Sequence, residues 1–164
     1  MPKPRDSYRF LLNYAFFLLG RRQYSEVELI KKCRLRAKKV TLEESEDALE
    51  KVIVRLHELE YLNDEKLAVS FLQNSLNLKP QGKRSFLVHM RKKGVAHDVA
   101  QKAWDAAQID EDILAHRLIA SKMGQFEKLD LIKQNRKIQY LLASRGFKSS
   151  LIWDILRERR CPPT

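Results

Sequence analysis

The 164-residue sequence contains little cysteine, glycine and proline, with two, five and five residues respectively. The two thiols, Cys33 and Cys161, cannot form a disulfide framework, and they cannot complete a zinc site by themselves. Pro80 is the only proline away from the termini, so little in the chain interrupts a helix. These absences favour a helical protein in a reducing compartment, and we expect a cytoplasmic location.

The sequence also lacks a long apolar run. The segment from Phe10 to Leu19 contains Asn13 and is too short to span a bilayer, and no small-residue cleavage site follows it. Apolar residues make up 44% of the chain, and the mean hydropathy is −0.46. The negative mean hydropathy excludes a membrane bundle. The apolar content is sufficient for a buried core, which excludes a disordered polycation. We expect no association with a membrane.

Apolar residues recur at spacings of three and four, which predicts helices, and no sustained alternation predicts a strand. Two capping boxes predict helix starts, Ser25 with Glu28 and Thr41 with Glu44. Glycines predict helix ends, because glycine adopts positive φ without a Cβ penalty. Besides the two helices that follow the capping boxes, we expect helices over residues 7–19, 64–77, 83–93, 98–107, 111–122, 130–145 and 149–159.

The helix pattern repeats about every 50 residues. Superposing Gly94 on Gly146, a shift of 52 residues, aligns apolar positions along both helices. The N-terminal unit fits less tightly, with Cys33 at the Met90 position and Ala37 at the Gly94 position. Units of this size are marginal alone and are stabilised by packing on their neighbours. The sequence therefore predicts an all-α fold, an elongated array of three tandem three-helix modules in a monomer, over residues 1–62, 63–109 and 110–164.

Motifs for catalysis and for cofactor binding are missing. Residues 82–85 lack the upstream glycine and the strand of a phosphate-binding loop. The four histidines form no pair at metal-ligand spacing, and no set of Ser, His and Asp indicates an activated nucleophile. The acidic residues Glu43, Glu44, Glu46 and Asp47 lie near an expected helix start, where they interact favourably with the macrodipole. We expect a protein that is not an enzyme and binds no cofactor.

Basic residues exceed acidic ones, with 32 Lys and Arg against 21 Asp and Glu and a net charge of +11. Cations at helix C-termini complement the macrodipole, which explains a few charges per helix but not this excess. A basic excess repeated along an elongated array is typical of a protein that binds a polyanion. If the protein neutralises about six phosphates, its affinity for the polyanion should fall by roughly three decades when the salt concentration rises from 50 to 200 mM. The residues that we expect to contact DNA or a protein partner are Arg36, Lys38, Lys39, Lys83, Arg84, Arg91, Lys92, Lys93, Arg136 and Lys137.

The aromatic residues favour packing over base stacking. Most of them lie at core spacing, as do Phe10, Phe16, Phe17, Phe71, Phe86, Trp104 and Trp153. No segment resembles a base-reading helix, so contact with a nucleic-acid backbone independent of sequence fits better. Three-helix units also resemble helix-turn-helix modules, and an autonomous DNA-binding protein or repressor is therefore an alternative. An RNA-binding adaptor is a further one.

Four segments resemble the motifs of one family in order and spacing: RQYSEVEL at 22–29, LHELEYLND at 56–64, MRKKGV at 90–95 and KIQYLLASRGF at 137–147. They are similar to RecX, the regulatory protein of the RecA recombinase, over about residues 8–159. The resemblance implies a modulator that binds RecA filaments on single- and double-stranded DNA, along the helical groove. It also implies suppression of ATP hydrolysis, strand exchange and cleavage of the LexA repressor. The sequence departs from the family pattern where Glu60 and Ala37 replace glycine and Cys33 replaces leucine.

Overall fold

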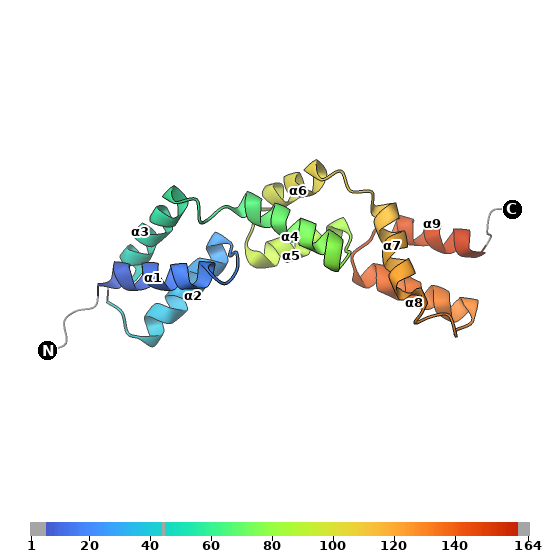
Figure 1. Ribbon diagram of the computed structural model, residues 1–164, viewed down its shortest axis with the longest axis horizontal. Helices are drawn as coiled ribbons and strands as arrows, with labels where there is room; N and C mark the ends of the chain where they lie inside the picture. Colours follow the sequence, from blue (N-terminus) through green and yellow to red (C-terminus); the bar gives the residue numbers. More distant parts are fainter. Residues whose placement is uncertain (1–5, 44, 161–164) are drawn as a thin grey trace.

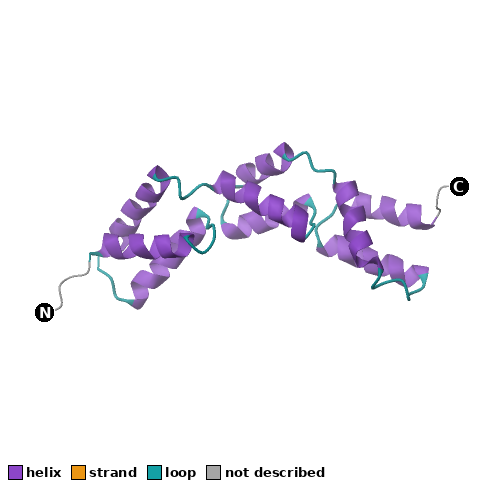
Figure 2. Ribbon diagram, viewed as in Figure 1, coloured by secondary structure: helices purple, strands orange, loops and turns teal. Residues whose placement is uncertain are grey.

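The computed structural model describes residues 6–43 and 45–160, and these ranges contain nine helices and no strand (Figure 1 and Figure 2). The helices are α1 (Ser7–Leu19), α2 (Glu26–Lys39), α3 (Ser45–Glu58), α4 (Asp64–Leu78), α5 (Lys83–Lys93), α6 (His97–Ala106), α7 (Glu111–Met123), α8 (Leu131–Ser144) and α9 (Ser149–Arg160). The all-α prediction is confirmed.

Five helices begin at a side chain that accepts a hydrogen bond from a backbone N–H of the first turn. The five N-cap residues are Asp6, Ser25, Asn63, Asp110 and Asp130. Such a bond satisfies one of the amides that has no partner within the helix. The local sequence therefore places most helix starts correctly.

The predicted capping box at Thr41 is wrong. Thr41 has φ +49 and ends α2, because its N–H and that of Leu42 bond back to the carbonyls of Lys38 and Ala37. This is the Schellman arrangement, in which the residue after the helix is left-handed. Glu44, the other half of the predicted box, lies outside the described residues.

The same arrangement corrects the predicted alignment of the N-terminal unit. Val95 N–H bonds to the Met90 carbonyl just as Leu42 N–H bonds to the Ala37 carbonyl. Thr41, rather than Ala37, therefore occupies the Gly94 position, and Ala37 occupies the buried Met90 position. The residue type gives no signal for this register, because Thr41 adopts the positive φ that glycine favours at the equivalent position of the second cluster.

Buried residues form three clusters along the elongated array (Figure 1). The first is built from α1–α3, the second from α4–α6 and the third from α7–α9. Leu76 and Ile109 pack against both the second and the third cluster. The exact division of the chain into three modules after residues 62 and 109 stays a prediction.

The aromatic residues divide between core and surface. Phe86 and Trp104 are buried, as expected from their spacing, and their ring centroids lie 5.5 Å apart. The prediction of packing is wrong for Phe17 and Trp153, which are 56% and 60% exposed. Helical spacing alone does not distinguish a residue at the edge of an apolar face from one at its centre.

The middle helices of the three clusters, α2, α5 and α8, are joined end to end. At the first joint the hydroxyl of Ser25, the N-cap of α2, donates to the Lys93 carbonyl at the end of α5. At the second joint the N–H of Gly82, the N-cap of α5, donates to the Arg145 carbonyl after α8, with N and O 2.9 Å apart. Helix C-termini carry partial negative charge and N-termini partial positive charge, so this order is electrostatically favourable. We call α2, α5 and α8 the spine.

Each joint also requires a glycine. A Cβ on Gly94 would lie 2.5 Å from Val27 Cβ, and a Cβ on Gly146 would lie 2.5 Å from Ser85 N. Both glycines have positive φ, +85° and +76°. Conformation and close approach therefore exclude a side chain at these two positions.

We expect Gly94→Ala to lower the free energy of unfolding by roughly 1–3 kcal/mol, because it combines positive-φ strain with the clash on Val27. Gly124→Ala is the matched control, since Gly124 has helical φ and ψ and a Cβ there would meet nothing within 4 Å. Urea unfolding followed by circular dichroism measures both variants. Equal midpoints for the two would contradict the requirement for glycine at the joint.

An ion pair crosses the first joint beside the Ser25 contact. Glu28 Oε2 lies 3.2 Å from Arg22 Nη1 and 3.3 Å from Lys93 Nζ. Burial alone raises the pKa of Glu28, but the hydrogen bonds and charges of Arg22 and Lys93 outweigh it and hold this pKa below its usual value. The carboxylate therefore stabilises the folded state above its unfolded pKa of about 4.3, and this stabilisation is lost as the pH falls through the lower folded value.

We expect Glu28→Gln to lower the unfolding midpoint at pH 7, and we expect a smaller deficit at pH 3, because the stabilisation by the carboxylate is lost as the pH falls. Glu50→Gln is the control, because Glu50 is exposed and forms no ion pair within 4 Å in the described chain. Thermal unfolding at both pH values provides the comparison. A deficit that is the same at pH 3 and pH 7 would rule out the ionic contribution.

Candidate functional site

Exposed cations recur at equivalent positions of the spine helices. With Thr41, Gly94 and Gly146 aligned, Lys31 of α2 corresponds to Arg84 of α5 and Arg136 of α8, and Lys38 corresponds to Arg91. All five side chains are exposed. We call Lys31, Lys38, Arg84, Arg91 and Arg136 the outer cations.

The outer cations lie opposite the buried side of each spine helix. The buried positions also correspond: Cys33, Phe86 and Ile138 form one equivalent set, and each is 0% exposed. Positions two residues before these three point away from the core, since a helix turns by about 100° per residue. The end-to-end joints then place the outer cations at successive points along the length of the spine.

No carboxylate neutralises the outer cations. Within residues 6–43 and 45–160, none of the five lies within 4 Å of an acidic oxygen. Their charges therefore face solvent and are available to a polyanion. Lys31 is not among the ten residues expected from the sequence; its equivalence to Arg84 and Arg136 follows from Thr41, rather than Ala37, occupying the Gly94 position.

Two of the ten predicted site residues are engaged inside the protein. Lys83 Nζ lies 2.8 Å from Asp105 Oδ1, and Lys93 Nζ forms the joint contact with Glu28. Their side chains are 26% and 21% exposed. The hydrogen bond from Lys83 holds the pKa of Asp105 below its usual value. The structure thus gives these two lysines partners within the fold.

The other eight predicted residues are exposed: Arg36, Lys38, Lys39, Arg84, Arg91, Lys92, Arg136 and Lys137. They are distributed over all three spine helices rather than gathered at one point. Arg36 lies against aromatic rings, with its guanidinium carbon 5.7 Å from the Phe10 ring centre and 5.6 Å from that of Tyr14. The predicted residues therefore form an extended surface.

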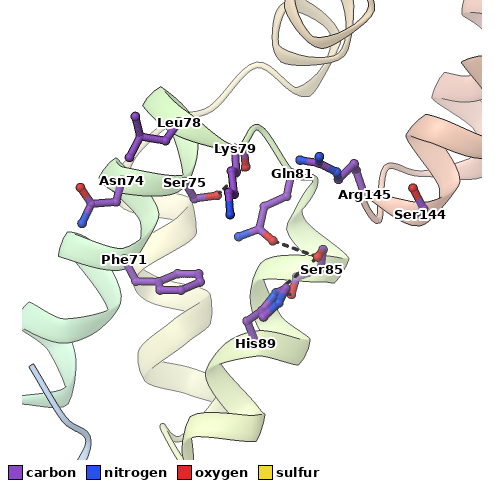
Figure 3. A pocket seen from close by; sticks show the side chains of 10 residues that line it. All are labelled: Phe71, Asn74, Ser75, Leu78, Lys79, Gln81, Ser85, His89, Ser144 and Arg145. Carbon is purple, nitrogen blue, oxygen red and sulfur yellow. Dashed lines mark hydrogen bonds between the residues drawn. The ribbon is translucent and has the colours of Figure 1, made fainter. Parts of the chain in front are cut away.

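A cleft of about 450 Å³ lies beside the second spine joint, between α4, α5 and the end of α8 (Figure 3). Phe71 and Leu78 give it an apolar wall, and its charged lining residues are Lys79 and Arg145, with no carboxylate. Gln81 is 7% exposed; its Oε1 accepts a hydrogen bond from Ser85, and its amide nitrogen points toward the Phe71 side (Figure 3). None of the ten predicted residues lines this cleft.

The described residues hold no group of three His, Cys, Asp or Glu side chains arranged to bind a metal ion. Burial raises the pKa of the Cys33 thiol to about 11, so this cysteine is protonated and unreactive at neutral pH. Within the same part of the chain, every helix is too short or too polar to span a bilayer. The two candidate functional features are therefore the outer cations and the cleft beside the second joint.

The described chain is thus an elongated, all-helical array with exposed cations repeated along its spine. No family model matches the sequence. A regulatory protein RecX of Prosthecochloris aestuarii is 32% identical over 151 residues, which cover 92% of this chain and 93% of the relative. A RecX of Pelodictyon phaeoclathratiforme is 27% identical over 146 residues, covering 89% of this chain and 86% of the relative.

Solved structures agree with these relatives. The crystal structure of RecX from Lactobacillus salivarius superposes with a TM-score of 0.75 over 94% of this chain and 97% of that chain, at 21% identity. A second RecX crystal structure gives a TM-score of 0.74, covering 93% of this chain and 74% of that chain. The chain belongs to the RecX family of regulatory proteins, as the resemblance of its motifs predicts.

We expect the double substitution Arg84→Gln with Arg91→Gln to weaken binding of a DNA duplex and to flatten its salt dependence. Losing two phosphate contacts should make the slope of log K against log salt less steep by about 1.8. Lys83→Gln is the matched control on the same helix, because Lys83 is paired with Asp105. Fluorescence anisotropy with a labelled duplex between 50 and 200 mM salt measures both. A slope changed equally by the control would contradict the assignment of the outer cations.

Proposed function

We propose that this chain binds RecA filaments assembled on DNA and suppresses their ATP hydrolysis, strand exchange and cleavage of the LexA repressor. In this role it binds a polymer without catalysing a reaction of its own. The observation that carries the proposal is the repetition of outer cations along the spine of a chain from the RecX family. The relatives are named regulatory protein RecX, which supports a regulatory role.

The length of the spine suits a polymer. The spine helices α2, α5 and α8 contain 14, 11 and 14 residues. At 1.5 Å per residue their combined length is roughly 60 Å, about twice the 30 Å diameter of a small domain. A ligand that repeats along its axis, such as a protein filament on DNA, can contact several of the outer cations at once.

Repeated weak contacts explain how such a surface can inhibit a filament. Each exposed cation contributes little, because water and salt screen it. Contacts joined in one chain act at a high effective concentration, so the total affinity exceeds that of any single contact. A chain laid across neighbouring subunits would restrain the movements that ATP hydrolysis and strand exchange require. We further propose that it acts as a cytoplasmic monomer on both single- and double-stranded DNA, since three modules in one chain already supply the repetition.

The test is RecA-dependent ATP hydrolysis on single-stranded DNA in the presence of the purified chain. We expect inhibition at micromolar protein, and at least a tenfold higher half-inhibitory concentration for Arg84→Glu combined with Arg91→Glu and Arg136→Glu. Arg157→Glu is the control, because Arg157 is paired with Asp154 on α9, away from the spine. Loss of inhibition in the triple variant but not in the control supports the proposal.

Hydrolysis that continues unchanged with the wild-type chain contradicts the proposal. If the chain then still binds DNA, it is an autonomous DNA-binding protein, the alternative from the sequence. Cross-linking to the filament gives a second measurement, because lysines of all three spine helices should react. Cross-links from one end of the chain alone would contradict binding along its length.

A further inference from the structure

Tyr140 is exposed in a way that packing does not explain. It lies on α8 and is 76% exposed. Among the residues that the structure describes, no other aromatic ring or guanidinium stacks against it. The exposed Phe17 differs, since the guanidinium carbon of Arg21 lies 4.8 Å from its ring centre. Most of the Tyr140 side chain is thus accessible to a ligand.

The ring borders a shallow groove of about 430 Å³, a volume typical of small-ligand sites. We call it the Tyr140 groove, and it is lined by Leu129, Lys133, Arg136, Lys137 and Tyr140. Positions 133, 136, 137 and 140 are neighbours on one face of a helix, because side chains three and four residues apart lie together. The groove therefore combines one aromatic ring with three cations.

The charge of the groove is positive. Lys133 Nζ lies 3.0 Å from Asp130 Oδ2, and hydrogen bonding from Lys133 holds the pKa of Asp130 below its usual value. Arg136 and Lys137 have no carboxylate within 4 Å in the described chain. Arg136 and Lys137, one turn before Tyr140 on α8, are therefore the two cations available to a ligand.

An exposed aromatic ring beside two free cations suits a single strand of nucleic acid better than a duplex. An aromatic ring next to free cations suits a nucleotide, with its base on the ring and its phosphates on the cations. In a duplex the faces of the bases are covered by their neighbours, so only a single strand can offer a base face to Tyr140. Arg136 is also one of the outer cations, and a strand that follows them along the spine reaches the groove.

We propose that the Tyr140 groove binds single-stranded DNA, with a base stacked on Tyr140 and the adjacent phosphates on Arg136 and Lys137. This inference rests on the proposed function, in which the chain binds DNA, and adds a site that distinguishes single strands. Lys133 stays with Asp130 and contributes less.

The test compares Tyr140→Ala and wild type in binding a labelled oligo-dT and a labelled duplex. We expect about tenfold weaker binding of oligo-dT and a less than twofold change for the duplex. Tyr140→Phe should keep the wild-type affinity, whereas Tyr140→Leu, which keeps an apolar side chain but no ring, should resemble Tyr140→Ala. Ile132→Ala is the matched control, because Ile132 is 68% exposed on the same helix and does not line the groove.

Salt dependence separates the ring from the cations. Tyr140→Ala should leave the slope of log K against log salt for oligo-dT unchanged, because stacking releases no counterions. Arg136→Gln with Lys137→Gln should make it less steep by about 1.4. In Tyr140→Trp, fluorescence beyond that of Trp104 and Trp153 should be quenched by oligo-dT and not by the duplex.

Three outcomes overturn the inference: unchanged oligo-dT binding by Tyr140→Ala, an equal loss for the duplex, and a loss of filament binding without a loss of oligo-dT binding. The last would make Tyr140 a protein contact. RecA-dependent ATP hydrolysis is measured in parallel. A wild-type chain that leaves hydrolysis unchanged but binds oligo-dT through Tyr140 contradicts the proposed function and supports the groove.

Discussion

The structure depends on the way one helix end meets another at the spine joints. Ser25 and Gly82 each donate a hydrogen bond to a carbonyl at the end of the next spine helix, and a glycine without a side chain lets the backbones approach. Each joint pairs helix termini of opposite partial charge. Leu76 and Ile109 also pack between the second and third clusters, but the joints set the order of the helices along the spine. The length and repetition of the basic surface follow from them.

Cations perform two different tasks on this fold. Lys83 and Lys93 are half-buried and stabilise the protein through Asp105 and Glu28. Arg84, beside Lys83 on the same helix, is exposed and has no carboxylate within 4 Å in the described chain. One step along a helix rotates a side chain by about 100°, which is enough to move a charge from an ion pair within the fold to the open surface. Adjacent basic residues therefore cannot be treated as one site.

Residues of positive φ follow several of the helices, and some of these residues are glycine while others are not. Gly94 and Gly146 lie at joints, whereas Thr41, Glu60 and Gln108 adopt positive φ of +49°, +54° and +46°. A side chain in this conformation costs about 1 kcal/mol, which a helix end can tolerate where nothing packs closely on it. Glu60, which departs from the family pattern of glycine, keeps the backbone conformation that glycine would favour.

The sequence by itself determined the helices, most of their caps and the basic character of the chain. These depend on neighbours along the chain: the apolar spacing of three and four, the oxygens of Ser25 and Asn63, and the count of charges. Tertiary structure alone decided which cations are free and that Phe17 and Tyr140 face solvent. Those outcomes depend on which groups from distant segments meet, and the pattern of a single helix carries no information about what packs on its edges.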